Sequence, residues 1–359
     1  MAAALGVVLP PDLPHELFLE FARRAEQVGL DEVWVFEDCF LRGGIAQASV
    51  VLSRTSRIRV GVGILPAGAR NVAFASLDIA TLAELFPGRL LVGIGHGMPA
   101  WMRQLGAWPA SPVTLLEEYI GALRSILAGR RTTVTGRHVT VRDVELHRPP
   151  AVPPPVFAGV RGPRSLAASG RVADGTVLAE PVTPEYLRAA LAHIGGASGT
   201  AAATTEGDPG GSGYPGDPGD PGDSSSGGSS GSHAAGNGGS HEIVAYNVGA
   251  VHESASVARD RARLGLQWIG EPDWAPHLAP LPFAAELAAL RARSTDREDF
   301  ARRLPDEWVD RLAVAGTPAQ VRAKLAALAD AGAHHLVLNL VGPDPLDSLD
   351  AFGDAVAEA

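Results

Sequence analysis

Eight short apolar runs, separated by longer segments of helical periodicity, constrain the fold more than any other feature of the sequence. They are residues 4–9, 32–36, 58–64, 90–94, 155–159, 174–179, 242–251 and 336–340. The runs are apolar along nearly their whole length, which is typical of parallel strands buried on both faces. Eight strand–helix units predict a (β/α)8 barrel, and an open doubly wound sheet is the alternative.

The intervening segments carry helix signals, with apolar residues at helical spacing and Pro or Gly at the ends. The predicted helices are 14–29, 71–86, 112–127, 184–194 and 317–331. A β-hairpin is predicted at 132–144, around Gly136. We therefore expect one barrel domain over 1–359, with a helical insertion at 265–312 before the last unit.

Residues 195–240 differ in composition from the rest of the chain. They are rich in Gly and Ser, include an Asp-Pro-Gly-Asp-Pro-Gly-Asp run and contain neither Lys nor Arg. Such a segment cannot bury enough apolar surface to offset the entropy of ordering it. We predict a disordered insert that acts as a linker.

Charge and cysteine content exclude several classes of protein. The formal net charge of −10 argues against nucleic acid as the main partner. No apolar run reaches the ~18–20 residues of a membrane helix, and the first residues lack the basic region of a signal peptide. The one cysteine, Cys39, excludes an intrachain disulfide framework and a Cys-rich zinc site. We expect a cytoplasmic protein that acts on a small molecule.

The chain has a single lysine, Lys324. A P-loop needs a Gly-Lys pair and a Schiff-base enzyme needs a placed lysine, so both classes are disfavoured. Lys324 lies in an amphipathic segment, where we expect it to face solvent. The histidines show no metal-binding spacing such as His-Glu-x-x-His, and His334 and His335 are adjacent, so they point to opposite faces of a strand. We expect no metal site.

In a barrel of this kind the active site lies at the carboxyl ends of the strands. The second run is followed by Glu37 and Asp38. These carboxylates can accept hydrogen bonds from a heteroaromatic ring or transfer a proton, or they belong to a solvated loop or a helix cap. Cys39 beside them has no evident general base, which favours a small buried side chain over a nucleophile.

The fourth run ends in Gly95, His96 and Gly97. The pattern is Gly-x-Gly-x-Gly, and it lacks the spacing of a dinucleotide fingerprint. Glycines permit close backbone approach to a flat ligand. His96 between them is a candidate for proton transfer or for hydrogen bonding to a ligand.

The fifth run is followed by Arg161, Gly162, Pro163 and Arg164. Proline is favoured in the first turn of a helix, where backbone N–H groups remain free. With two arginines this helix start predicts an anion site, and a capped helix with two solvated arginines is the alternative.

With these motifs in order, the chain resembles the bacterial luciferase-like monooxygenase family. The resemblance rests on segments 25–38, 55–97, 154–175 and 315–340, and the second of these is the most specific. It implies a (β/α)8 barrel whose ring cofactor lies across the carboxyl ends of the strands. Some members use FMN, a partner flavin reductase and oxygen. Others use coenzyme F420, a deazaflavin, and transfer a hydride.

The resemblance also implies which residues bind the cofactor. In the deazaflavin group, a non-proline cis peptide bulges under the ring, and the matching bond here is Gly63–Ile64. The polar pair at the headgroup maps to Glu37 and Asp38. The remaining cofactor-binding positions map to Gly95, His96, Gly97, Gly159, Val160, Gly162 and Pro163, to which the anion site adds Arg164.

The chain departs from the sugar-phosphate dehydrogenases of that family, in which a histidine and a glutamate perform the acid–base steps. Asp38 and Met98 stand at those places here, and Met98 cannot transfer a proton. His96 and Asp38 remain the catalytic candidates. We expect an F420-dependent oxidoreductase, and we keep an FMN-dependent monooxygenase and a cofactor-free barrel subunit as alternatives. A homodimer is expected in each case.

Overall fold

In the computed structural model, eight parallel strands form a closed barrel, as predicted. The structure describes residues 3–38, 40–196 and 240–357. The barrel strands are β1 (Ala4–Val8), β2 (Glu32–Val35), β3 (Arg59–Pro66), β4 (Leu90–Gly95), β7 (Val156–Gly159), β8 (Gly175–Leu178), β9 (Glu242–Val251) and β11 (His335–Leu340). Each strand pairs with the next in this order, and β11 returns to β1. The closed barrel excludes the open sheet.

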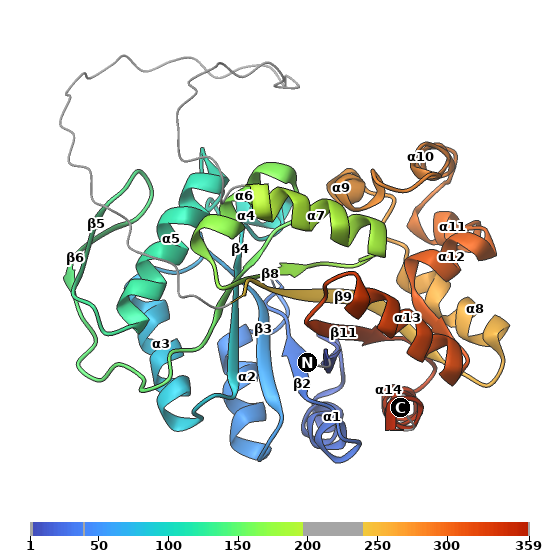
Figure 1. Cartoon of the computed structure of the whole chain (residues 1–359), viewed down its shortest axis with the longest axis horizontal. Coiled ribbons are helices and arrows are strands. Elements are labelled where there is room, and N and C mark those ends of the chain that lie inside the picture. Colours follow the sequence, from blue (N-terminus) through green and yellow to red (C-terminus); the bar gives the residue numbers. More distant parts are fainter. Residues whose placement is uncertain (1–2, 39, 197–239, 358–359) are drawn as a thin grey trace.

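Helices surround the strands (Figure 1). They are α1 (His15–Gln27), α2 (Gly44–Arg54), α3 (Val72–Leu85), α4 (Pro99–Gln104), α5 (Pro112–Leu127), α6 (Pro163–Val172), α7 (Pro184–Gly196), α8 (Ala255–Gly265), α13 (Pro318–Asp330) and α14 (Pro345–Ala357). The predicted helices are all present. The predicted hairpin is β5 (Thr132–Thr135) and β6 (Thr140–Val144), which pair antiparallel. The sequence analysis did not assign α2, α4, α8 or α14.

Side chains fill the barrel interior, so it is a packed core and not a pore. The interior cluster consists of Val8, Trp34, Leu91, Phe157, Val177, Val244, Tyr246 and Val337. The rings of Trp34 and Tyr246 meet edge to face, with centroids 5.6 Å apart. Such pairs add about 0.5–1.5 kcal/mol to the stabilisation from burial. The aromatic side chains of this cluster lie beneath the carboxyl end of the barrel and support it.

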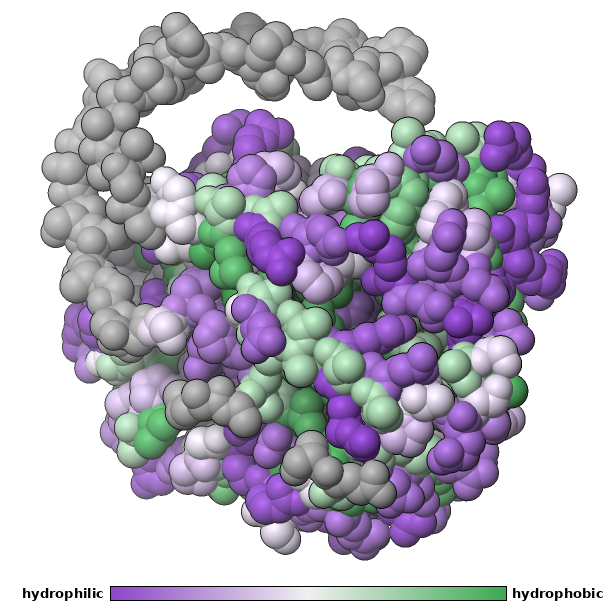
Figure 2. Space-filling model, turned by 45° about the vertical axis from the view of Figure 1, so that its right-hand side comes forward, coloured by the Kyte–Doolittle hydropathy of each residue, from purple (hydrophilic) through white to green (hydrophobic). Residues whose placement is uncertain are grey.

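Short helices gather on one side of the barrel, before the last strand–helix unit (Figure 1). They are η1 (Pro272–Trp274), α9 (Ala275–Leu278), α10 (Ala284–Ala292), α11 (Arg297–Arg302) and α12 (Asp306–Leu312). They enclose a hydrophobic cluster of their own with α8 and the end of β9. Hydrophilic residues cover most of the right-hand surface in Figure 2, where this side is turned forward.

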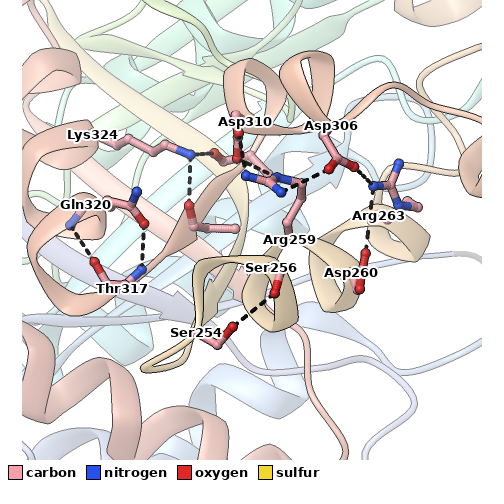
Figure 3. Close-up of polar contacts among 12 residues, drawn as sticks. Ser254, Ser256, Arg259, Asp260, Arg263, Asp306, Asp310, Thr317, Gln320 and Lys324 are labelled. Atoms are coloured by element: carbon pink, nitrogen blue, oxygen red, sulfur yellow. Dashed lines mark hydrogen bonds and ion pairs between the residues drawn. The ribbon is translucent and has the colours of Figure 1, made fainter.

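Lys324 does not simply face solvent, which corrects the expectation from the sequence. The lysine is half-buried, and its Nζ donates hydrogen bonds to the carbonyls of Ala313 at 3.1 Å and Ala315 at 2.8 Å (Figure 3). These carbonyls flank Val314 in the short strand β10 (Val314–Gly316), which extends the sheet beside β9. Burial lowers the pKa of Lys324. The lysine therefore stabilises this strand.

An ion network closes the amino-terminal end of the barrel. Glu32 is fully buried and contacts Arg59 at 2.5 Å, the Trp34 indole N–H at 2.8 Å and His335 Nδ1 at 2.8 Å. The other ring nitrogen of His335 lies 3.2 Å from Glu242. Both ring nitrogens thus face carboxylates, an arrangement that requires a protonated imidazole. Charged groups at this end of a barrel serve stability, because the chemistry of the fold takes place at the opposite end.

Most of the predicted disordered insert, residues 197–239, lies outside the described residues. Cys39 lies outside them as well. Among the helices that the structure describes, none is both long and apolar enough to span a membrane.

Candidate functional site at the carboxyl end of the barrel

Strand β3 bulges at its carboxyl end, where the Gly63–Ile64 peptide bond is cis. The pairing of β3 with β4 shifts between Val62 and Leu65, so one extra residue is accommodated on β3. The Ile64 side chain lies over the glycines of β4 and β7. A β-carbon on Gly95 would lie 2.9 Å from Ile64 Cγ1, and one on Gly159 would collide with Ile64 Cγ2. The bulge thereby forms a platform at the mouth.

Two of the predicted glycines, Gly95 and Gly97, also have a packing requirement. We expected Gly95 and Gly97 to allow direct approach of a ligand. The space beside Gly95 is taken by Ile64, whereas Gly97 has a φ of +72° and packs against Met102. The packing of the mouth therefore requires glycine at both positions, and their role in cofactor binding stays a prediction.

Glu37 is fully engaged by neighbouring groups. Arg70 contacts both of its carboxylate oxygens, with the Nη2–Oε2 pair at 2.7 Å, and the Gly44 N–H donates to Oε2 at 2.8 Å. Gly44 begins α2, so Glu37 acts as a helix cap, one of the two alternatives that the sequence left open. A cavity of about 370 Å³ opens beside Arg70 and is also lined by Trp108 and His138.

His96 is half-buried and uncharged at neutral pH. Its Nε2 lies 3.1 Å from the hydroxyl of Ser165, in the first turn of α6. Burial, followed by the charge of Arg161, lowers the pKa of His96 to about 4, although a hydrogen bond to the backbone of Pro112 opposes the shift. His96 therefore cannot serve as a cationic acid at neutral pH, but it can exchange hydrogen bonds with a ligand.

The start of α6 has the properties of an anion site. Pro163 occupies the first turn, and Gly162 at the N-cap offers no side-chain hydrogen bond to the free backbone N–H groups. Arg164 is exposed beside them. Val160, in contrast, is buried, and its N–H donates to the carbonyl of Val177 on β8 at 3.3 Å, so this amide is already paired within the sheet.

Arg161 does not join Arg164 at the helix start. Its guanidinium lies 4.7 Å from the ring of Trp274 and donates to the carbonyl of Asp273 at 3.3 Å. Arg161 therefore links the mouth of the barrel to the helical region around η1. The expected pair of arginines at the anion site is reduced to Arg164 alone.

The sequence analysis missed Glu180, which lies two residues after the end of β8. The carboxyl lies close enough to Asp38 and Arg161 for their charges to act on it. Burial raises the pKa of Glu180, a backbone hydrogen bond and then the charge of Arg161 oppose the shift, and the charge of Asp38 adds the smallest contribution in the upward direction. Burial also raises the pKa of Asp38. Glu180 could have been found from its position after the sixth barrel strand, since the ends of the strands form the mouth.

These groups can hold a flat ring with an anionic tail. The Ile64 platform offers an apolar surface for a ring, and the free N–H groups of α6 with Arg164 offer donors for a phosphate. Met98, at the place where a glutamate was sought, is the N-cap of α4 and packs against the apolar cluster of the helical region. Among the described residues, no group of three or more His, Cys, Asp or Glu side chains is arranged to hold a metal ion.

Comparison with known proteins adds to this geometry. A family model described as luciferase-like monooxygenase matches residues 9–335. The 5,10-methylenetetrahydromethanopterin reductase of Methanolobus tindarius is 24% identical over 98% of this chain and 98% of its own. The F420-dependent glucose-6-phosphate dehydrogenase of Microbacterium testaceum is 28% identical over 48% of this chain and 54% of its own.

Solved structures share the fold. The coenzyme F420-dependent tetrahydromethanopterin reductase of Methanopyrus kandleri superposes with a TM-score of 0.75 at 18% identity, covering 100% of this chain and 99% of its own. A type II Baeyer–Villiger monooxygenase of Pseudomonas putida, in complex with FMN, has a TM-score of 0.65 at 16% identity, covering 100% of this chain and 99% of its own.

Proposed function

Because the chain belongs to the luciferase-like monooxygenase family, we propose that it is an oxidoreductase that transfers a hydride between coenzyme F420 and a small organic substrate. The observation that carries the proposal is the Ile64 platform, which is built into the strand end where the family places its ring cofactor. Bound F420 would supply a hydride-carrying ring carbon. The protein supplies orientation, which is the main requirement of such a transfer.

The residues at the mouth fit the two parts of this cofactor. Gly63 and Ile64 would lie under the ring. Asp38 would hydrogen-bond to the ring, since no ion pair among the described residues engages its carboxylate. Gly162, Pro163 and Arg164 would hold the phosphate tail at the start of α6. His96, in its neutral form, would hydrogen-bond to the ligand together with Ser165. Glu37 would act indirectly, because it fixes Arg70 and the start of α2.

Titration of the purified protein with both cofactors tests the proposal. We expect F420 to bind with micromolar or tighter affinity, as measured by the fluorescence of the deazaflavin. FMN should bind much more weakly. Asp38→Ala should weaken F420 binding. Tight FMN binding without detectable F420 binding would instead support an FMN-dependent monooxygenase with a partner flavin reductase. That alternative is favoured by the FMN-bound structural neighbour of the same fold.

We also propose that the enzyme is a homodimer formed through α3. The side chains of Phe74 and Leu77 are 70% and 52% exposed on this helix, and Leu85 at its end is 64% exposed. Large apolar side chains that gather on an exposed helix surface mark a protein–protein contact. Phe74→Asp should convert the dimer to a monomer in light scattering, whereas Leu264→Asp on α8 should not. A wild-type monomer would contradict this assembly.

The proposal places the enzyme in the cytoplasm. With one cysteine the chain has no intrachain disulfide framework that an oxidising compartment would favour. Fractionation of the native host cells, with the enzyme followed by antibody, checks this assignment.

A further inference from the structure

A second cavity lies outside the wall of the barrel, between the strands and the helices that cover them. Its volume is about 390 Å³, and it is bounded by β10, the start of α7, the end of α12 and one face of α13. Asn247 of β9 also lines it, and this side chain points away from the barrel interior, because the neighbouring Tyr246 belongs to the interior cluster. Asn247 accepts from the N–H of Val182 at 2.9 Å and donates to its carbonyl at 3.1 Å. Among the described residues that line the cavity, none is a predicted cofactor-binding residue of the mouth.

Apolar side chains form most of the wall of this cavity. Val182, Leu312, Val314 and Leu328 line it, and each of them is at most 3% exposed. Cavities of roughly 300–1,000 Å³ with mainly apolar walls and a few polar groups are typical binding sites for small molecules. The wall therefore suits an apolar chain or ring, and the polar groups decide what else such a ligand must carry.

Two ion pairs engage the other charged side chains that line the cavity. Glu185 and Arg311 contact each other. Arg259 binds both carboxylate oxygens of Asp310, with the Nε–Oδ1 pair at 3.0 Å and the Nη2–Oδ2 pair at 2.9 Å (Figure 3). Each pair combines one positive and one negative charge, so neither pair attracts a charged ligand strongly.

Lys324 is the charged side chain of the cavity wall that no carboxylate binds within the part of the chain that the structure describes. Its ammonium group has three N–H donors, and the carbonyls of Ala313 and Ala315 accept two of them (Figure 3). Burial lowers the pKa of Lys324, although the charge of Asp310 opposes the shift. A further negative charge beside the ammonium would therefore stabilise it. The wall thus presents one positive charge with one N–H donor to spare.

We infer that this cavity is a second ligand site, which binds a monocarboxylate with an apolar tail. One carboxylate oxygen accepts the remaining N–H of Lys324, and the tail lies against Val314 and Leu328. A charge-assisted hydrogen bond of this kind is stronger than a bond between neutral groups. A phosphate fits the cavity less well, because most of its oxygens would lie unpaired against an apolar wall. The inference does not depend on the proposed function, since F420 is assigned to the mouth.

The single lysine allows a direct test in the full-length protein. Lysine labelled with carbon-13 at Cε gives one NMR signal, which reports on Lys324 alone. Hexanoate should shift this signal saturably and raise the pH at which it titrates, because a bound carboxylate stabilises the ammonium. Hexylamine has the same tail and the opposite charge, and it should leave the signal unchanged. Acetate lacks the tail and should bind about tenfold more weakly, or weaker still, than hexanoate. An absent shift with hexanoate, an equal shift with hexylamine, or equal affinity for acetate would overturn the inference.

Two variants test whether the charge of Lys324 in particular holds the ligand, with isothermal titration calorimetry of hexanoate as the measurement. Lys324→Met should lose about tenfold or more in affinity, because the charge-assisted hydrogen bond is gone. Arg188→Met is the matched control, since it removes an exposed positive charge from α7, and it should retain the affinity of the wild-type protein. Unchanged affinity in Lys324→Met, or an equal loss in both variants, would contradict the site. Should Lys324→Met fail to fold because β10 loses two hydrogen bonds, the labelled wild-type protein decides the question by itself.

Discussion

The side chain of Ile64 occupies the space into which a β-carbon on Gly159 would project. The two residues lie on β3 and β7, on either side of β4, so the bulge extends across a whole strand. Gly95 completes the arrangement from β4, since a β-carbon there would also meet Ile64 at 2.9 Å. The shape of the mouth thus depends on the absence of a β-carbon at the two glycines that contact Ile64.

Gly159→Ala should therefore disturb the platform. The added methyl group displaces Ile64, and overpacking of this kind costs about 1–3 kcal/mol of unfolding free energy. Urea unfolding and F420 titration measure the two consequences, and we expect weaker cofactor binding along with lower stability. Gly121→Ala, at an exposed position of α5, is the control, because a β-carbon there meets no protein atom within 4 Å. Equal stability of both variants would show that Ile64 moves freely.

The Glu32–His335 network predicts how stability depends on pH. Burial alone would lower the pKa of His335, but the hydrogen bonds and charges of Glu32 and Glu242 outweigh it and raise the pKa above the ordinary 6.5. The stabilisation is therefore complete below about pH 6.5 and is lost as pH rises through the folded-state pKa. A tenfold gain in the proton affinity of the imidazole on folding corresponds to about 1.4 kcal/mol of stability.

At acidic pH the same network makes the free energy of unfolding depend on pH in the opposite direction. Burial opposes ionisation of Glu32, but His335, Arg59 and Trp34 lower its pKa below the ordinary 4.5. This stabilisation is present above pH 4.5 and is lost as pH falls through the lowered value. His335→Gln should remove the decline in unfolding free energy above pH 6.5, measured by urea titration. His15→Gln, at a side chain that is 88% exposed, should behave as wild type.

Arg164→Ala should weaken F420 binding several-fold and reduce its dependence on salt. An exposed arginine attracts the anionic tail by an interaction that salt screens over about 8–10 Å. Titrations at low and high ionic strength should converge in the variant more than in the wild type. Arg171→Ala, at the other end of the same helix, is the control. It tests whether the loss of any positive charge on α6 reduces the salt dependence of F420 binding. Identical salt slopes in wild type and Arg164→Ala would exclude a tail contact.

Replacement of residues 198–239 by a short Gly/Ser bridge should leave the melting temperature within a few degrees of wild type. The segment has no periodic apolar face, and each doubling of loop length costs only about 0.6 kcal/mol in closure entropy. Differential scanning calorimetry and F420 titration are the measurements. Failure to fold, or loss of F420 binding, would instead assign the segment a role as a lid.

The sequence alone determined the barrel, because each strand is an unbroken apolar run, and such a run indicates burial on both faces. It likewise located the helix starts at Pro163 and Thr317, since proline and capping residues act within a few positions of where they stand. The strand ends that form the mouth followed from the fold class. These signals are local in the chain, so they can be recognised without knowing which distant residues pack against them.

Only the tertiary structure decided which charged groups meet. Glu37 is engaged by Arg70, 33 residues away, and His335 meets Glu32 across 303 residues. Ionisable side chains follow no periodic pattern, so their partners and their protonation depend on distances that closure of the barrel sets. The fold was therefore predictable from residue order, whereas the chemistry of the mouth was not.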